Sequence, residues 1–242
     1  MSQLPHMTSD SPSESDQPLS VVTVDGPSGA GKGTLSVALA AHLGWHFLDS
    51  GALYRLVGWQ ALEQEAALDD QRALESIARH LDVTFDIDES GGYATVASGV
   101  VVDGLIRDEK VAAAASRVAA VQNVRDALLQ RQRDFLKPPG LVADGRDMGT
   151  VVFPGAPVKL YITASAKERA RRRYEQLKAS GTDANLRALL SDIQARDQRD
   201  KERDSAPLRP ADDAFVIDTT RMSVKEVIGC ALEILRRRFP AR

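Results

Sequence analysis

A chain of 242 residues, 43% of them hydrophobic, is long enough to bury a substantial core, which excludes a wholly disordered protein. Its formal net charge of −3 lacks the basic excess of a non-specific nucleic-acid binder, so any anion site must be local. The sequence has no run of about 18 apolar residues that could cross a membrane, and a single cysteine excludes an intramolecular disulfide.

The first 18 residues are rich in serine, proline and acidic residues, and they lack the basic start and apolar run of a secretory signal. This composition predicts a disordered tail over residues 1–18 and one folded domain over residues 19–242. Cys230 lies in an apolar helical pattern, which predicts a buried core residue rather than a nucleophile. These features indicate a reducing compartment, and we expect a cytoplasmic protein.

Short runs rich in valine, isoleucine and leucine recur along the chain, and each is followed by a polar or glycine-rich turn. They lie at residues 21–24, 46–48, 141–143, 158–162 and 214–217. Helical patterns separate most of them, and this alternation is typical of a parallel sheet with helices on both faces. The sequence therefore predicts an α/β fold in which helices flank a five-stranded parallel sheet.

The turn after the first run carries a phosphate-binding motif. Residues 26–32, GPSGAGK, match the G-x-x-x-x-G-K pattern of a P-loop, in the expected place between a strand and a helix. The glycines let backbone N–H groups curl around a triphosphate, and the ammonium of Lys32 can contact its β and γ phosphates. The ATP-binding residues that we expect are Gly26, Pro27, Ser28, Gly29, Ala30, Gly31, Lys32, Gly33 and Thr34.

The P-loop departs from the usual pattern at one position. Gly33 stands where a serine or threonine normally provides a hydroxyl ligand for Mg²⁺. Thr34 follows one residue later, which is a rotation of about 100° around the helix. The sequence therefore indicates no firm protein ligand for Mg²⁺, which we expect to be held through the nucleotide and through water, with Thr34 as a candidate.

Residues from about 68 to 107 interrupt the alternation of strands and helices. The segments VTFDID and YATVASGVVVDG lie on either side of ESGG, which predicts a small antiparallel sheet with a turn at Gly91 and Gly92. We interpret residues 68–136, with the helical patterns that follow this sheet, as an insertion into the parallel fold.

Two polar segments follow the second and third strands, where an open parallel sheet binds its ligands. They are LDSGALYR, with Ser50 and Arg55, and ADGRDMGTVVFP, with Arg146. Each arginine can present a planar fork to a phosphate. The alternative is purely structural, with a helix-capping serine and two arginines in surface salt bridges.

The region after the fourth strand is predicted to be helical and dense in charge. Residues 167–209 hold 12 lysines or arginines against 8 aspartates or glutamates, behind a predicted capping box formed by Ser165 and Glu168. The charges alternate at i, i+3 and i+4, so a solvated helix face is the alternative to a functional role.

A second predicted capping box, Ser223 and Glu226, opens the last helix. Apolar residues follow at helical spacing, which predicts one face packed on the core. They are Val224, Val227, Ile228, Ala231, Leu232 and Leu235.

Three segments in this order, GPSGAGKGT, DSGALYR and DGRDMGTVVFP, resemble the bacterial cytidylate kinase family of P-loop nucleoside monophosphate kinases. The resemblance covers nearly all of residues 21–239 and includes ARDQRDKERDSAPL near the end. It implies a P-loop kinase core, with residues 68–136 as a monophosphate-binding insertion and an arginine-rich lid within residues 165–210. It also implies transfer of the γ-phosphoryl group of ATP to CMP or dCMP, with Mg²⁺.

The resemblance also assigns roles to individual residues. Three groups would bind the acceptor: Ser50, Arg55 and Arg146 at the CMP phosphate and sugar, Ser116, Arg125 and Asp147 at the cytosine, and Arg196, Asp200 and Arg203 in the lid, where Asp200 and Arg203 also contact CMP. The implied catalytic residues are Lys32, Arg146, Arg196 and Arg203.

The cytosine assignment makes chemical sense, because the base offers an N4 donor with N3 and O2 acceptors. An acceptor such as Asp147 and a donor such as Arg125 would satisfy these groups. Structural alternatives remain for Ser116, as a small packing residue in an alanine-rich helix, and for Asp147, as an ion pair with its neighbouring arginine.

Other functions would need features that the sequence lacks. A nucleotide-switch NTPase would need a guanine-reading Asn-Lys-x-Asp stretch or a paired Asp-Glu after an apolar strand, and a nucleic-acid-binding module would need interleaved aromatics. The nearest alternative is a UMP or dual UMP/CMP kinase. We expect a monomeric kinase whose partners are ATP and CMP or dCMP, and neither a nucleic-acid polymer nor a membrane.

Overall fold

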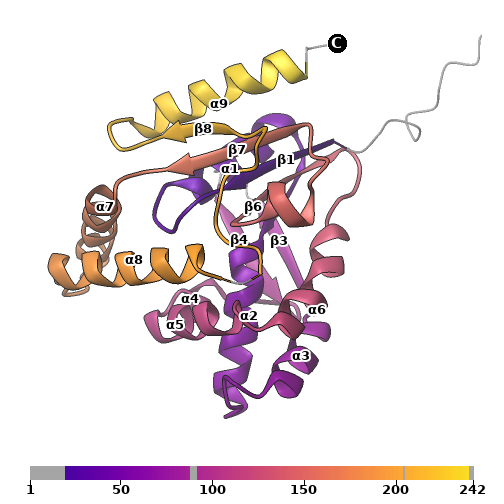
Figure 1. The fold of residues 1–242 in the computed structure, drawn as a ribbon, viewed down its shortest axis with the longest axis vertical. Helices are drawn as coiled ribbons and strands as arrows, with labels where there is room; N and C mark the ends of the chain where they lie inside the picture. The colour runs from indigo at the N-terminus through magenta and orange to yellow at the C-terminus, as the bar shows by residue number, and fades with distance from the viewer. Residues whose placement is uncertain (1–19, 88–91, 204, 240–242) are drawn as a thin grey trace, which may run out of the picture.

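The computed structural model describes residues 20–87, 92–203 and 205–239, so the predicted tail over residues 1–18 lies outside the described residues. Five strands form one sheet in the order β2-β6-β1-β7-β8, and all neighbouring strands are parallel (Figure 1). They are β1 (Ser20–Asp25), β2 (His46–Asp49), β6 (Gly140–Gly145), β7 (Val158–Thr163) and β8 (Phe215–Asp218). Each predicted apolar run falls at one of these strands, so the five-stranded parallel sheet is confirmed.

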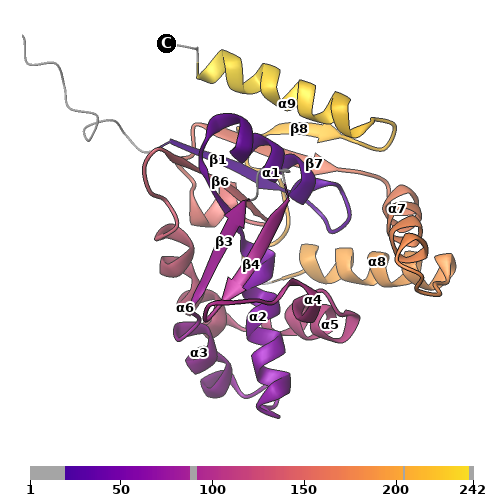
Figure 2. The same cartoon turned by 180° about the vertical axis from the view of Figure 1, so that it is seen from behind.

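The sheet is covered on both faces because its strands carry apolar side chains on both (Figure 2). On β1, Val22 and Val24 pack with helices α1 and α9, whereas Val21 packs on the opposite face with α2. Helices α3, α5 and α6 extend the second layer around α2. The bounds are α1 (Lys32–Leu43), α2 (Ser50–Glu63), α3 (Gln71–Arg79), α5 (Glu109–Val118), α6 (Gln122–Arg133) and α9 (Val224–Arg238).

The predicted antiparallel sheet is also confirmed, with one strand more than the sequence indicated. It consists of β3 (Val83–Ile87), β4 (Tyr93–Ala97) and β5 (Val100–Val101). The extra strand arises at Ser98 and Gly99, whose φ angles of 48° and 78° are those of a tight hairpin turn. The predicted Gly-Gly turn includes Gly91, which lies outside the described residues.

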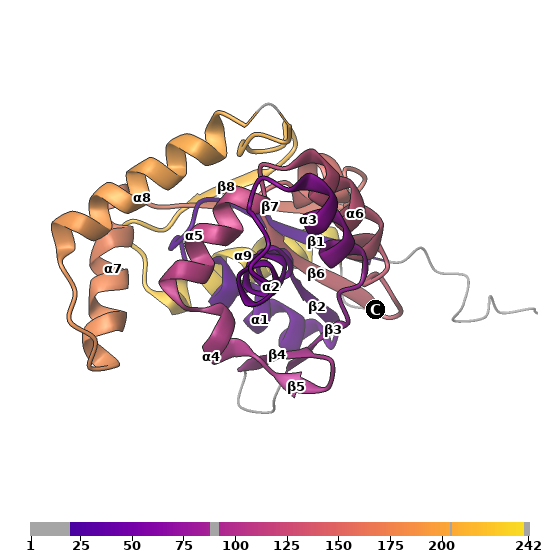
Figure 3. The same ribbon diagram turned by 90° about the horizontal axis from the view of Figure 1, so that it is seen from below.

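Helices α7 (Ala166–Ala179) and α8 (Leu186–Lys201) project from the body of the molecule as an arm (Figure 3). They make up most of residues 167–209, which were predicted to be helical, but as two helices and not one. The helix breaks before Asn185, whose side chain accepts from the N–H groups of the first turn of α8, and it ends at Lys201. Asparagine, aspartate, serine and threonine are favoured at the start of a helix and not in its interior, because their side chains accept hydrogen bonds from nearby backbone N–H groups.

The two predicted capping boxes have different outcomes. In α9, Ser223 accepts from the Glu226 N–H and Glu226 returns the bond, so this box is confirmed. In α7, Ser165 accepts from the Glu168 N–H at 3.2 Å, but the Glu168 carboxylate pairs with Arg171 and Arg172 instead. The box does not close because the Ser165 N–H already donates to the Thr220 hydroxyl at 2.9 Å, which leaves the Glu168 carboxylate to the guanidiniums.

Helix α9 packs on the sheet through one face, as predicted, but two residues do not follow the expectation. Val227, Ala231 and Leu235 are buried, whereas Val224 is 58% exposed. Cys230 is exposed, so the prediction of a buried core cysteine was wrong. It lies about 100° around the helix from its buried neighbour Ala231, which turns it away from the sheet. Within the described part of the chain, no helix is long and apolar enough to cross a membrane.

The turn after β1 brings its backbone so close to β7 that only glycine fits. Gly26 has a φ of +145°, and a Cβ added there would lie 1.9 Å from the carbonyl oxygen of Ile162. We therefore expect Gly26→Ala to lower the free energy of unfolding by at least about 2 kcal/mol, measured by urea denaturation.

Gly229→Ala is the matched control for this substitution. A Cβ at Gly229 meets no atom within 4 Å, and alanine favours helix there by up to about 1 kcal/mol. Equal effects of the two substitutions would show that the close approach of Gly26 to Ile162 does not limit stability.

Candidate functional site

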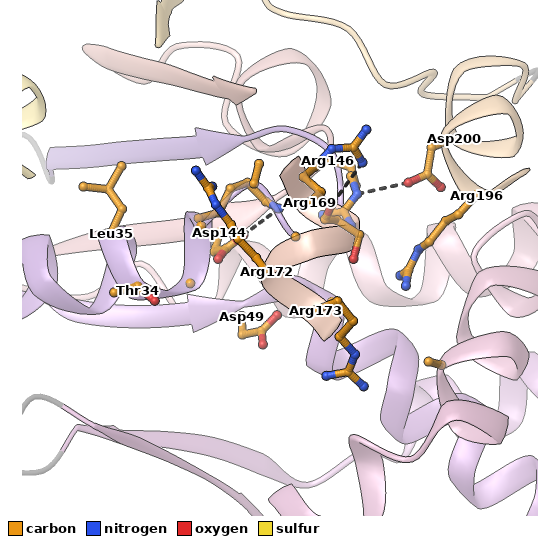
Figure 4. Close-up of a pocket in the computed structure, with 18 of the residues that line it drawn as sticks. Thr34, Leu35, Asp49, Asp144, Arg146, Arg169, Arg172, Arg173, Arg196 and Asp200 are labelled. Atoms are coloured by element: carbon orange, nitrogen blue, oxygen red, sulfur yellow. Dashed lines mark hydrogen bonds and ion pairs between the residues drawn. The ribbon is translucent and has the colours of Figure 1, made fainter. Parts of the chain in front are cut away.

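A cavity of about 830 Å³ opens at the carboxyl ends of β1, β2 and β6, between the helical arm and α5 (Figure 4). The predicted site residues that line it are Ser28, Gly29, Ala30, Gly31, Lys32, Gly33, Thr34, Ser50, Arg55, Ser116, Arg125, Arg146, Asp147, Arg196, Asp200 and Arg203. Gly26 and Pro27 do not line it. The structure therefore brings residues from distant parts of the chain to one edge of the sheet, where parallel sheets bind ligands.

The P-loop is held in place from outside by two residues that the sequence analysis did not assign. Arg169 of α7 donates to the Ser28 carbonyl at 3.1 Å, and the Thr219 hydroxyl donates to the Ala30 carbonyl, also at 3.1 Å. These two hydrogen bonds restrain the loop from outside the cavity. Such preorganisation lowers the entropic cost of binding.

Lys32 begins α1 and is buried at the bottom of the cavity. Its Nζ donates to the Pro27 carbonyl at 3.0 Å and lies 3.9 Å from an oxygen of Asp144. Burial, followed by the charge of Arg146, lowers the pKa of Lys32 to about 8. Burial also raises the pKa of Asp144 to about 6, although Lys32 opposes this shift. The Lys32 ammonium is thus held between the backbone of the P-loop and the carboxylate of Asp144.

The start of α2 shows that Ser50 is not a helix cap. Asp49 occupies that position, and its Oδ1 accepts from the Ala52 N–H at 3.0 Å. Ser50 instead lies against the end of β6, where a Cβ on Gly145 would come within 2.6 Å of its Oγ. The structural alternative for Ser50 was therefore wrong, and its hydroxyl faces the cavity lining.

Arg125 of α6 and Asp147 form a buried ion pair. The alternative of an ion pair between Asp147 and its neighbour Arg146 was wrong. Arg125 also donates to the Ala119 carbonyl at 3.3 Å, so the guanidinium is fixed from two sides. The pair presents a donor and an acceptor side by side in the wall of the cavity.

Ser116 lies on the face of α5 toward the helical arm, and its hydroxyl accepts from Nε of Arg199 at 3.3 Å. The close packing expected of a small residue belongs instead to its neighbours, because a Cβ on Gly58 would lie 2.9 Å from the Ala115 nitrogen. Ser116 is therefore a hydrogen-bonding residue between α5 and α8.

Asp200 at the end of α8 joins two arginines that face the cavity. It accepts from Nε of Arg146 at 3.1 Å (Figure 4), and its other oxygen pairs with Arg203. Burial would raise the pKa of Asp200, but Arg146 and then Arg203 hold it below its usual value. The ionised carboxylate thus keeps both guanidiniums oriented.

Arg196 differs from these arginines, since its Nε is buried without a hydrogen-bond partner. Burial, followed by the charge of Arg146, lowers the pKa of Arg196 to about 10. Repulsion from neighbouring guanidiniums and an unpaired donor both favour binding of an anion here. A solvated helix face does not describe this residue.

Three aspartates missed by the sequence analysis end the strands at this edge: Asp25, Asp49 and Asp144. Asp25 is buried, and its two oxygens accept from the N–H groups of Met148 at 2.8 Å and Gly149 at 2.7 Å. It thereby fixes the turn after β6, a short π-helix over Met148–Val152. The signal available in the sequence was an aspartate directly after the apolar runs at residues 21–24, 46–48 and 141–143.

The fold and the cavity define the class of protein as a P-loop kinase. A P-loop with its lysine occupies one side, and a group of arginines oriented by carboxylates faces it from the other. Two anionic ligands can therefore meet in one cavity, as phosphoryl transfer requires.

Comparison with known proteins gives the family. The sequence profile of the family described as cytidylate kinase matches residues 22–237. The cytidylate kinase of Pseudomonas aeruginosa strain LESB58 is 57% identical over 209 residues, which cover 86% of this chain and 91% of that protein. The cytidylate kinase of Stutzerimonas stutzeri strain A1501 is 55% identical, with 88% and 93% covered. Cytidylate kinase 1 of Haemophilus influenzae is 53% identical, with 90% and 94% covered. The chain therefore belongs to the cytidylate kinase family.

The unpaired donor of Arg196 predicts how the folded protein responds to polyanions. Inorganic tripolyphosphate should raise the melting temperature of the wild type, because an anion that binds only the folded state stabilises it. In Arg196→Ala this increase should be smaller, since loss of a charge-assisted hydrogen bond weakens binding by about 1.5–3 kcal/mol.

Arg187→Ala is the matched control, because Arg187 is exposed on the same helix and does not line the cavity. This variant should respond to tripolyphosphate like the wild type. An equal response of all three proteins would show that Arg196 does not take part in anion binding.

Proposed function

We propose that this enzyme transfers the γ-phosphoryl group of ATP to CMP or dCMP, which yields ADP and CDP or dCDP. The observation that carries the proposal is the single cavity with a P-loop on one side and an arginine group on the other. Its volume of about 830 Å³ lies in the upper part of the range of ligand sites, which suits two nucleotides end to end.

The donor half of the site is the P-loop over residues 26–34. The N–H groups of the loop and the N-terminus of α1 would surround the β phosphate, and Lys32 would contact the β and γ phosphates. Nζ of Lys32 donates a hydrogen bond to the Pro27 carbonyl at 3.0 Å, which holds the ammonium over the loop. A bound phosphate would compete with this carbonyl for the ammonium.

Few side chains near Lys32 could act as ligands for Mg²⁺. Among the described residues there is no group of three or more His, Cys, Asp or Glu side chains that could hold a metal ion. Asp144 is the carboxylate next to Lys32 and Gly33, and Thr34 is exposed at the cavity wall. Mg²⁺ bound here would neutralise phosphate charge, with Asp144 and Thr34 contacting it directly or through water.

The acceptor half contains Ser50, Arg55 and Arg146, which we assign to the phosphate and sugar of CMP. Arg55 is oriented by Asp49 at 2.7 Å and Arg146 by Asp200 at 3.1 Å. Guanidiniums held in this way present fixed donors to a phosphate, so less rotamer entropy is lost on binding.

We assign the Arg125–Asp147 pair and Ser116 to the cytosine base. Asp147 can accept from the exocyclic N4 amine, and Arg125 can donate to N3 or O2. Uracil presents an acceptor at position 4, which would lie against the carboxylate and leave buried polar groups unpaired. The site should therefore select cytosine over uracil.

We further propose that residues 68–136 are the monophosphate-binding insertion and that residues 165–210 contain the lid. Arg196, Asp200 and Arg203 lie at the end of α8 on the cavity side. In this position Arg196 and Arg203 would stabilise the charge on the transferring phosphoryl group, while Asp200 orients Arg203.

The reaction needs no general base, because the CMP phosphate is already ionised near pH 7. One of its oxygens would attack the γ phosphorus in line, and the bond from that phosphorus to the β–γ bridging oxygen would break, leaving ADP. Lys32 and the arginines offset the repulsion between the phosphates, and the helical arm excludes water as a rival acceptor.

We also propose that one chain is the functional unit, because a single chain supplies both halves of the site.

The lone Cys230 suits a reducing compartment, and we place the enzyme in the cytoplasm on that basis. Light scattering during size exclusion measures the first proposal, and fractionation of cells measures the second.

The test of function is ADP formation from ATP and Mg²⁺ with no acceptor, and then with CMP, dCMP, UMP, AMP or GMP. We expect fast turnover with CMP and dCMP, and turnover at least about tenfold slower with UMP. Lys32→Ala should abolish most of the activity. Equal rates with CMP and UMP would favour a dual UMP/CMP kinase, and equal turnover without any acceptor would favour an NTPase.

The pKa of Lys32 predicts how activity depends on pH. Its value of about 8 means that the ammonium, which binds phosphate, is lost as the pH rises above 8. We expect kcat/KM for ATP to be level between about pH 7 and 8, above the pKa of Asp144 of about 6, and to fall about tenfold per pH unit well above pH 8, measured with saturating CMP.

Lys32→Arg provides the control, because a guanidinium remains charged over this range. In Lys32→Arg, kcat/KM for ATP should not fall above pH 8, even if the variant is slower than the wild type at every pH. The same decline in both proteins would assign the titration to another group.

A further inference from the structure

The antiparallel sheet contacts the acceptor half of the cavity through one side chain. Tyr93, the first residue of β4, donates its hydroxyl to Oδ2 of Asp49 at 2.9 Å. The two residues are 44 positions apart in the sequence and come from different sheets, and both line the cavity. The contact therefore joins the insertion directly to the edge of the parallel sheet.

Asp49 also holds Arg55. The same Oδ2 atom accepts from Nη2 of Arg55 at 2.7 Å, while Oδ1 accepts from the Ala52 N–H at 3.0 Å. Burial would raise the pKa of Asp49, but Arg55 and then the bond from Tyr93 hold it below its usual value. The carboxylate therefore stays ionised and has donors on both of its oxygens.

Arg55 has little freedom around this contact. A Cβ on Gly51 would lie 3.0 Å from Oδ1 of Asp49 and 3.2 Å from Nη1 of Arg55, so the first turn of α2 is closely packed against the pair. Nε of Arg55 is buried without a hydrogen-bond partner. Asp49 thus occupies one side of the guanidinium and leaves donors for another anion.

Tyr93 is itself fixed by contacts to its ring. The ring packs edge-on against Phe47 with centroids 4.9 Å apart, and the guanidinium of Arg107 lies over it at 5.6 Å. Arg107 pairs with Asp103 at 3.0 Å, and Asp103 accepts from the Thr95 N–H on β4 at 2.7 Å. The hydroxyl is therefore presented to Asp49 from a rigid base.

We propose that Tyr93 is a positioning residue for the acceptor phosphate. Through Asp49 it fixes the guanidinium of Arg55, so the antiparallel sheet sets the orientation of a phosphate-binding group that belongs to α2. The inference rests on the proposed function, in which Arg55 contacts the phosphate of CMP. It also gives the insertion a second role besides its own contacts with the nucleotide.

Tyr93→Phe tests the proposal, because it removes the hydroxyl and retains the ring contacts with Phe47 and Arg107. The variant should bind CMP about fivefold more weakly in calorimetric titration and show a similar increase in KM for CMP. The KM for ATP should stay unchanged, because the P-loop does not contact Tyr93.

Two comparisons separate positioning from a merely structural role. Thr84→Val also removes a hydroxyl from this sheet, on an exposed position of β3, and it should bind CMP like the wild type. In an Arg55→Ala background, Tyr93→Phe should weaken CMP binding no further, because its effect passes through Arg55.

The proposal is overturned if Tyr93→Phe binds CMP like the wild type, if KM rises equally for CMP and ATP, or if the effect persists fully in Arg55→Ala. Titration with inorganic phosphate measures binding without turnover. Tyr93→Phe should weaken the binding of phosphate by the same factor as the binding of CMP. A wild type that makes no CDP would refute the proposed function, whereas an unchanged affinity for phosphate would refute the role of Tyr93 alone.

Discussion

Pairing of buried cations with carboxylates is the constraint on which this site depends. Lys32 lies beside Asp144, and Arg125 is paired with Asp147 in the cavity wall. A buried cation without such a partner costs several kcal/mol, so a cavity rich in arginine folds only if carboxylates are built in beside it. Arg196 lines the cavity with a buried Nε that has no hydrogen-bond partner, a feature that it shares with Arg55, although Asp49 pairs with Arg55. The carboxylates thus offset part of the positive charge that faces the cavity.

Three carboxylates at this edge come from the ends of neighbouring strands. Asp25, Asp49 and Asp144 end β1, β2 and β6, and parallel strands bring their carboxyl ends to the same edge. Each has a different task, since Asp25 fixes the turn after β6, Asp49 holds Arg55, and Asp144 lies beside Lys32. The electrostatics of the site thus follow from the order and direction of the strands.

Local patterns in the sequence predicted much of this molecule. The five apolar runs, the P-loop and the capping box of α9 are short-range features, because each depends on residues within one turn, strand or helix end. The errors concern burial and the partners of side chains. Cys230 lies within the apolar pattern of α9 but off its buried face, and Glu168 pairs with arginines and not with the N–H of Ser165.

The sequence by itself determined that a phosphate-binding loop lies between a strand and a helix, and which arginines were available to face it. Only the tertiary structure decided their partners. Arg125 meets Asp147 across 22 positions, and Arg146 meets Asp200 across 54. Spacing along the chain cannot fix such pairs, because they form only when the sheet order and the packing of α6 and α8 bring distant side chains to one edge.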